Sequence, residues 1–490
     1  MRALLGRLAQ LSLGYGLVQW TGSFISLVFT PLLTRSLTPG DYGLADYLAT
    51  FSSAFGTLAL LALPQAVMAH YHDRPHEPEW PRRVTGSALA VSALSGSAAG
   101  LAIGLLAPLL SEAIFQDRRY TPLFLWVSLT IFFAVNNAVL TGAAQAGLRL
   151  RWGMAFSLTT ITATALGNVV FVIVGRLGVP GMALVQLTSA AALSLVALVV
   201  MRPVIGRPAP ALAARLARSG AALLPATAAA WVLQMADRLF LVHYVSPTEL
   251  GYYAIANKIA SLLFIAMAPV HTAWTPLALS IQHQPQAREA YAGVARYVMA
   301  AVLLAALGLG LFARELLLVF AHAPYLPAAP YAGLLIYVQV FHTAGAVISA
   351  GALAGKQFRA ITGAVLAAAA VNLLLNALLI PVWKLWGAAI ATVAGYALAP
   401  LLLYPMAQRR RHIPYPLGRL GLAALIQAGL LAAGLNLPPL GWPAEIVLKA
   451  VALALFPAAL VVTGLIRPSE VTRAWQFLAR RWAPTTTDRP

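Results

Sequence analysis

The chain has 490 residues, of which 60% are hydrophobic and only 10% are charged. An ordinary soluble domain carries about 25% charged residues, so this composition excludes a soluble globular protein. The sequence has no Cys, which excludes disulfide scaffolds, thiolate metal sites and cysteine nucleophiles. We therefore expect an all-α integral membrane protein.

Fourteen segments are apolar enough, over about 20 residues each, to cross a membrane as helices. They cover residues 11–33, 43–69, 84–108, 122–146, 152–174, 179–201, 220–244, 250–278, 292–313, 328–354, 360–380, 385–406, 418–436 and 444–466. The N-terminal stretch carries Arg2 and Arg7 and lacks a compact apolar core with a small-residue cleavage site. We therefore expect it to be retained as the first helix.

The net charge of +19 predicts the orientation of the chain. Lys and Arg tend to stay in cytoplasmic loops, and the two ends and the even-numbered loops hold 24 of the 33 Lys and Arg residues. Because the acidic residues are shared evenly between the two sides, nearly all of the excess charge lies on one side. Both termini are predicted to be cytoplasmic, and the basic charge gives no reason to expect nucleic acid as a partner.

An internal repeat appears at an offset of 208 residues. Residues 38–43 and 246–251 both fit the pattern [ST]-P-x-[DE]-x-G. Each copy is typical of a helix start, with a hydroxyl N-cap, Pro at the first helical position and a carboxylate at the third. Asn168 and Gly181, echoed by Asn372 and Gly387, give a second correspondence. A single capping box is a common helix start, but two copies at equivalent spans favour duplication.

Six spans separate the equivalent positions, so the two halves have the same orientation and are related by an axis along the membrane normal. We expect two six-helix bundles around a central cavity, plus two extra C-terminal helices. The predicted units are an N-terminal bundle (1–201), a cytoplasmic linker (202–219), a C-terminal bundle (220–406), the last two spans (407–466) and a cytoplasmic tail (467–490). Within the tail, aromatic and Arg residues of 468–482 predict a segment on the inner membrane face.

Three charged residues lie at membrane depth in consecutive spans: Asp237, Arg238 and Lys258. At 1.5 Å per residue they lie roughly 9 to 13 Å below the outer surface. Buried charges normally face a wet or protein-lined interior, so we expect Lys258 to pair with Asp237 and to leave Arg238 free for an anion. The alternative is an ion cluster that only holds the two helices together.

Other polar residues at membrane depth predict a hydrated cavity, although each amide could serve only to join helices. They are Gln65, Asn136, Asn137, Asn168, Gln234, Asn257, His271, Asn372 and Asn376. Arg35 and Asp46 lie near the outer ends of the first two spans, where they either charge the cavity rim or snorkel to the surface. The His-rich tract 70–77 favours a solvated loop over a metal site, and no phosphate-binding Gly-Lys-[ST] loop is present.

The sequence resembles the polysaccharide (O-antigen type) lipid flippase family of the MOP exporter superfamily over nearly its whole length. The residues that carry the resemblance are LTRSLTPGDYG at 33–43, the Asp237-Arg238 pair, ELGYYA at 249–254, WTP at 274–276, Gly355-Lys356, Asn372, Asn376, Pro381 and 387–389.

The resemblance implies alternating access, which moves polyprenyl-pyrophosphate-linked oligosaccharides from the cytoplasmic to the outer leaflet of the bacterial inner membrane. Polysaccharide polymerase or glycosyltransferase machinery would be its protein partners. No cofactor and no metal site are expected, and a coupling ion, H⁺ or Na⁺, is left open. We assign substrate binding to Arg238, Lys258, Arg35, Asn257 and Gln234, and charge balance or ion coupling to Asp237 and Asp46.

Two other functions compete with this prediction. A cation-coupled multidrug exporter of the same superfamily would usually have twelve helices and acidic residues for cationic drugs. A membrane glycan polymerase or ligase would need catalytic groups on a long outer loop, and the longest outer loops, about 13 or 14 residues, hold no convincing acid and base pair. We therefore favour a transporter of lipid-linked sugar over an enzyme.

Overall fold

The computed structural model describes residues 29–74, 76–410, 412–436 and 441–467, which form helices and turns without a β-strand. The helices of the first half are α2 (Pro39–Leu60), α3 (Leu63–His70), α4 (Trp80–Phe115), η1 (Arg118–Tyr120), α5 (Thr121–Ala146), α6 (Leu150–Gly167), the π-helix η2 (Asn168–Val174), α7 (Gly178–Met201) and η3 (Arg202–Val204). Those of the second half are α8 (Pro210–Leu241), α9 (Pro247–Ile281), α10 (Ala287–Leu311), α11 (Ala313–Phe320), η4 (Ala323–Ala328), α12 (Ala329–Ala354), α13 (Phe358–Arg410), α14 (Leu417–Leu435) and α15 (Trp442–Val462).

Twelve helical segments of the described chain are long and apolar enough to cross a membrane. They account for thirteen of the fourteen predicted spans, because α13 contains two of them: its backbone turns at Lys384, where φ is 49°. The first predicted span, 11–33, lies mostly outside the described residues, as does the predicted tail segment 468–482. The chain is a multi-pass, all-α membrane protein.

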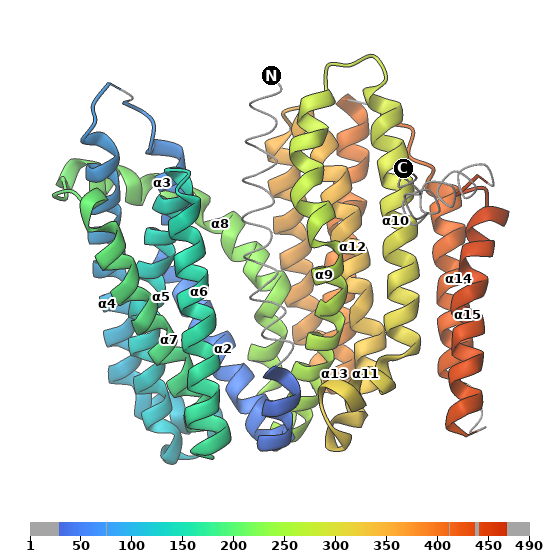
Figure 1. Ribbon diagram of the computed structural model, residues 1–490, viewed down its shortest axis with the longest axis horizontal. Helices are drawn as coiled ribbons and strands as arrows, with labels where there is room; N and C mark the ends of the chain where they lie inside the picture. The colour runs from blue at the N-terminus through green and yellow to red at the C-terminus, as the bar shows by residue number, and fades with distance from the viewer. Residues whose placement is uncertain (1–28, 75, 411, 437–440, 468–490) are drawn as a thin grey trace, which may run out of the picture.

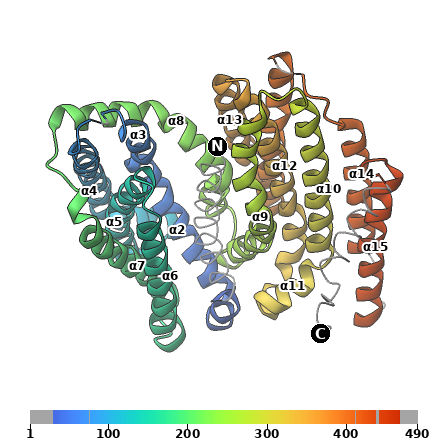
Figure 2. The ribbon, with the colours of Figure 1, turned by 45° about the horizontal axis from the view of Figure 1, so that its top comes forward.

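The helices form two bundles, with α14 and α15 on the far side of the second (Figures 1 and 2). The first bundle comprises α2 to α7 and the second α8 to α13. Lys449 of α15 is buried and donates to Glu315 of α11 at 2.6 Å, which ties the extra pair to the second bundle. The predicted architecture of two bundles and two added helices is confirmed.

Helix α8 starts against the first bundle and crosses to the second (Figure 1). It begins at Pro210, inside the predicted linker 202–219, and carries Pro225 in its interior. Near its start, Leu212 and Leu216 are buried in the core of the first bundle. Its later residue Leu233 packs on Ala368 and Ala369 in the second bundle. The predicted linker is therefore largely helical, and the domain boundaries themselves stay a prediction.

We name the two ends of the molecule by what lies there. The basic end, at the top of Figure 1, holds the connections from α3 to α4, α9 to α10 and α12 to α13. The capped end, at the bottom, is where α2 and α9 begin. The predicted capping boxes are both present there: Thr38 bonds Asp41 at the start of α2, and Ser246 bonds Glu249 at the start of α9.

Candidate functional site

The first turns of α2 and α9 cross in direct backbone contact at the capped end. A Cβ atom on Gly43 would meet the carbonyl oxygen of Pro247 and the amide nitrogen of Gly251. Reciprocally, a Cβ atom on Gly251 would overlap the carbonyl of Pro39. Only glycine allows this approach at both positions. The two copies of the repeat thus pack on each other around a local two-fold axis, which closes the capped end between the bundles.

Next to this crossing, an ion pair joins the bundles. Arg238 of α8 donates from Nε to the carboxylate of Asp46 on α2 at 2.7 Å. The Arg238 side chain is 7% exposed and that of Asp46 29%. Seven residues separate Asp46 from the start of α2, so the pair lies about 10 Å into the helix. A charge that is nearly buried and bonded across the bundles stabilises this closed arrangement.

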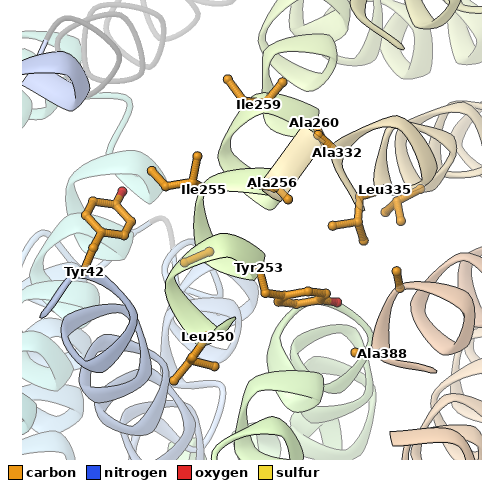
Figure 3. Close-up of a cluster of buried hydrophobic side chains, with 14 of the residues drawn as sticks. Tyr42, Leu250, Tyr253, Ile255, Ala256, Ile259, Ala260, Ala332, Leu335 and Ala388 are labelled. Carbon is orange, nitrogen blue, oxygen red and sulfur yellow. The ribbon is translucent and has the colours of Figure 1, made fainter. Parts of the chain in front are cut away.

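Asp237 lies on the other side of Arg238, inside the second bundle. Arg238 donates to it from Nη1 at 3.2 Å and from its backbone amide at 2.9 Å. The second carboxylate oxygen accepts from the hydroxyl of Tyr253 on α9 and, at 3.2 Å, from the hydroxyl of Thr392 on α13. Tyr253 points from α9 toward the helix that carries Ala388 (Figure 3). The Asp237 carboxylate is therefore buried and fully engaged.

Lys258 does not pair with Asp237, and this prediction was wrong. Its ammonium group lies 3.4 Å from the hydroxyl of Tyr42 on α2. Arg238 is not free either, since it bonds both Asp46 and Asp237. The expectation assumed that adjacent positions, which point about 100° apart on a helix, would not pair. It failed because the long Arg238 side chain folds back onto Asp237. Asp46 of α2, Asp237 and Arg238 of α8 and Tyr253 of α9 thus form one group, which we call the cross-bundle cluster. The alternative interpretation, an ion cluster that joins helices, is met in part, because this cluster includes α2 and lacks Lys258.

The remaining predicted residues are spread over three places. Gln234, one turn before Arg238, is exposed and lines a cavity. Asn257 is half-buried and donates to the carbonyl of Tyr253 on its own helix at 3.2 Å. Arg35 is exposed near the capped end. Gln234 lies one turn from Arg238 on α8, and Asn257 and Lys258 lie one turn beyond Tyr253 on α9. Arg35 shares no hydrogen bond or ion pair with these residues in the described part of the chain.

A cavity of about 400 Å³ lies within the second bundle. Helices α8, α9, α12 and α13 line it, with Gln234, Phe264, His342 and Tyr396 among its side chains. The ring of His342 lies 5.1 Å from that of His271, whose Nε2 lies 3.1 Å from the hydroxyl of Thr343. The sequence prediction included His271 and missed His342, although a histidine within a predicted span was a sufficient signal.

Three of the membrane-depth amides join helices. Asn136 accepts from Ser92 at 2.8 Å, Asn137 accepts from Ser194 at 2.7 Å, and Asn372 donates to the carbonyl of Ala391 at 3.1 Å. These bonds connect neighbouring helices of one bundle or the two halves of α13. Their structural role is the one that the sequence favours for a single amide.

The His-rich tract at the basic end also has a structural role. His70 bonds Asp73 at 2.7 Å and Ser219 of α8 at 3.0 Å, and Nε2 of His72 lies 3.0 Å from the carbonyl of Ala146. Among the described residues, no group of three or more His, Asp or Glu is arranged to hold a metal ion.

Solved structures with the same fold include a lipid flippase and multidrug resistance transporters. The lipid II flippase MurJ in an inward closed conformation superposes with a TM-score of 0.71 at 12% identity, over 94% of this chain and 99% of that one. An inward-facing MATE family multidrug resistance transporter of the MOP superfamily gives 0.63 at 15% identity, over 81% and 94%. An outward-facing one gives 0.57 at 16% identity, over 82% and 95%.

Sequence comparison narrows the family. A search of curated protein sequences gives no match. The model of the family described as "Polysaccharide biosynthesis protein" matches residues 10–282, which is more than half of the chain. This chain, with its two repeated bundles and its transporter fold, belongs to the polysaccharide biosynthesis protein family.

Proposed function

We propose that this protein flips polyprenyl-pyrophosphate-linked oligosaccharides from the cytoplasmic to the outer leaflet of the bacterial inner membrane by alternating access. The family match supports a role in polysaccharide synthesis. A sugar headgroup cannot cross hydrocarbon with its hydroxyls and phosphates unpaired. A flippase must therefore supply polar partners inside the protein while the lipid tail stays in the bilayer.

The single observation that carries this proposal is the cross-bundle closure at the capped end. The glycine crossing of α2 and α9 and the pair between Asp46 and Arg238 join the bundles there. Figure 1 shows the bundles diverging toward the basic end, which the charge distribution assigns to the cytoplasm together with both termini. This is the arrangement required of a flippase that receives its cargo from the cytoplasmic leaflet.

We assign different roles to the two cations. Lys258 has a neutral partner, Tyr42, and is half-buried, so in this conformation it is the cation available to the pyrophosphate. Asn257, next to it in the sequence, and Gln234 of α8 would bond sugar hydroxyls. Arg238 would engage phosphate only after the bundles part and its bond to Asp46 breaks, and its planar fork suits that ligand. Arg35 would meet the headgroup at the capped end. Asp237 and Asp46 would balance charge, and coupling to H⁺ or Na⁺ would act through them.

A multidrug exporter is the second candidate, because MATE transporters share the fold. A cationic drug needs an unneutralised carboxylate at membrane depth. Both carboxylates at this depth, Asp46 and Asp237, accept bonds from Arg238. The electrostatics therefore favour an anionic cargo. We propose no catalytic step, and we place the polymerase or glycosyltransferases that use the flipped lipid outside this chain.

Proteoliposomes give the direct test. We would measure the transbilayer movement of a labelled polyprenyl pyrophosphate oligosaccharide, with a cationic dye as a second cargo. Wild type is expected to move the lipid, and Lys258→Gln and Arg238→Ala are expected to move it at least tenfold more slowly. The control is Arg83→Ala, which removes an exposed charge of the first bundle. Movement of the dye alone would assign the chain to drug export.

A further inference from the structure

A second hollow lies far from the cross-bundle cluster, at the basic end of α13. It measures about 650 Å³ and is lined by Lys356, Gln357, Phe358, Arg359, Ala360, Met406 and Arg409. We call it the α13 pocket. Its walls come from the tight turn before α13 and from the first and last turns of that helix, which lie together because α13 doubles back at Lys384.

The α13 pocket is strongly cationic. Lys356, Arg359 and Arg409 are exposed, and none of them forms an ion pair with another described residue. No Asp or Glu is among the lining residues. The first turn of α13 is part of the wall, so its backbone amides and the positive end of the helix dipole add to the same field. The pocket thus offers three cations and helix-terminal donors to an anion with several oxygens.

The pocket is also preformed by a buried side chain. Gln357 is 9% exposed and donates from Nε2 to the carbonyl of Ala407 at 3.3 Å. This bond joins the turn before α13 to its last turn. The two backbone segments that carry the cations are therefore joined beside one hollow.

Apolar side chains next to the cations identify the source of the anion. Phe358 is 60% exposed and Met406 is 42% exposed, and both line the pocket. A soluble phosphate would make no apolar contact with these two side chains. A phospholipid would place its phosphate on the cations and its acyl chain on the apolar side chains. Basic pockets of this kind on the cytoplasmic side of membrane proteins suit anionic lipid headgroups.

We infer that the α13 pocket binds the phosphate headgroup of an anionic phospholipid from the cytoplasmic leaflet. Lys356, Arg359 and Arg409 hold the phosphate, while Phe358 and Met406 contact the upper acyl chain. Such a lipid would contact both ends of α13 at once and so hold that end of the second bundle at the membrane surface. The site shares no residue with the proposed cargo site and does not depend on the identity of the cargo.

The test compares wild type with the variant Lys356→Gln, Arg359→Gln, Arg409→Gln. The matched control is Arg83→Gln, Arg151→Gln, Arg288→Gln, which removes three exposed arginines assigned to the same membrane side. Purified full-length protein is titrated with phosphatidylglycerol or phosphatidylcholine in detergent, and bound lipid is counted by native mass spectrometry. We expect wild type and the control to prefer phosphatidylglycerol by about tenfold, and the pocket variant to lose that preference.

Two further results would overturn the inference. Equal loss of lipid in the pocket variant and the control would mean that only total basic charge matters. Binding of inorganic pyrophosphate is measured in a parallel titration. If millimolar pyrophosphate binds in the pocket and phosphatidylglycerol does not, the ligand is a soluble phosphate. A thermal unfolding scan without added lipid checks that both triple variants are folded.

Discussion

Arg238 has two carboxylate partners, one in each bundle, and under the proposed alternating access the bond to the partner on α2 would break. In Asp46→Asn, the neutral amide can still accept a hydrogen bond, but the ion pair across the bundles is lost and Asp237 is the remaining carboxylate partner of the guanidinium. Breaking a buried pair costs about 3–5 kcal/mol, and the 29% exposure of Asp46 lowers our expectation to about 1–3 kcal/mol. Thermal unfolding of the purified variant would measure this loss.

A second pair provides the control. Arg74 and Glu77 bond at 2.9 Å, but both side chains are about half exposed, so Glu77→Gln should change the free energy of unfolding by less than about 1 kcal/mol. A double variant, Asp46→Asn with Arg238→Gln, should be more stable than the sum of the single losses implies, because the two groups are coupled. Strict additivity would show that the cross-bundle bond contributes nothing.

Gly43 is the residue at which added volume should matter most. In Gly43→Ala, the new methyl group would press on the backbone of Pro247 and Gly251, which cannot rotate away. We expect a loss of about 1–3 kcal/mol in the free energy of unfolding, as in overpacked cores. Gly40→Ala, three residues earlier on the same helix, is the control, since its Cβ atom would lie at 3.6 Å from Pro247. Equal effects of the two changes would contradict the close crossing.

At the scale of elements, the two capping boxes should stabilise their helices independently of any cargo. Thr38→Ala and Ser246→Ala each remove the side chain that accepts from the third backbone amide of the helix. We expect each to lower the free energy of unfolding by about 1 kcal/mol. The control is Ser36→Ala at the same end, because the Ser36 hydroxyl is exposed and bonds only the carbonyl of Leu32. Unaltered stability of both cap variants would contradict this.

The same elements show what a sequence can predict. The starts of α2 and α9 were predictable because a capping box depends on residues within one turn. The spans were predictable because hydropathy is a local property. The bond between Asp46 and Arg238 was not, since its partners are 192 residues apart and only the packing of α2 on α8 brings them together. The role of Tyr253 and Thr392 as partners of Asp237 depends in the same way on how α8, α9 and α13 meet.

At the scale of the molecule, alternating access requires the bundles to separate at the capped end. The chain has no Cys, so two cysteines introduced there have no native thiol to compete with them. A Cβ atom on Gly40 would lie 3.7 Å from Oγ1 of Thr248, so side chains at these two positions meet across the bundles. We expect oxidised Gly40→Cys, Thr248→Cys protein to lose at least nine-tenths of its flipping in proteoliposomes, and a reductant to restore it.

The matched control places the same bond within one bundle. Thr164 of α6 donates to Ser189 of α7 at 3.1 Å, so the variant Thr164→Cys, Ser189→Cys should cross-link as readily. Because this bond connects two helices within one bundle, the proposal expects oxidation to leave flipping unchanged. If fully cross-linked Gly40→Cys, Thr248→Cys protein flips lipid as fast as the same protein treated with a reductant, the capped end does not open during transport. The closure between α2 and α9 would then be a fixed joint, and cargo would have to leave by a path between other helices.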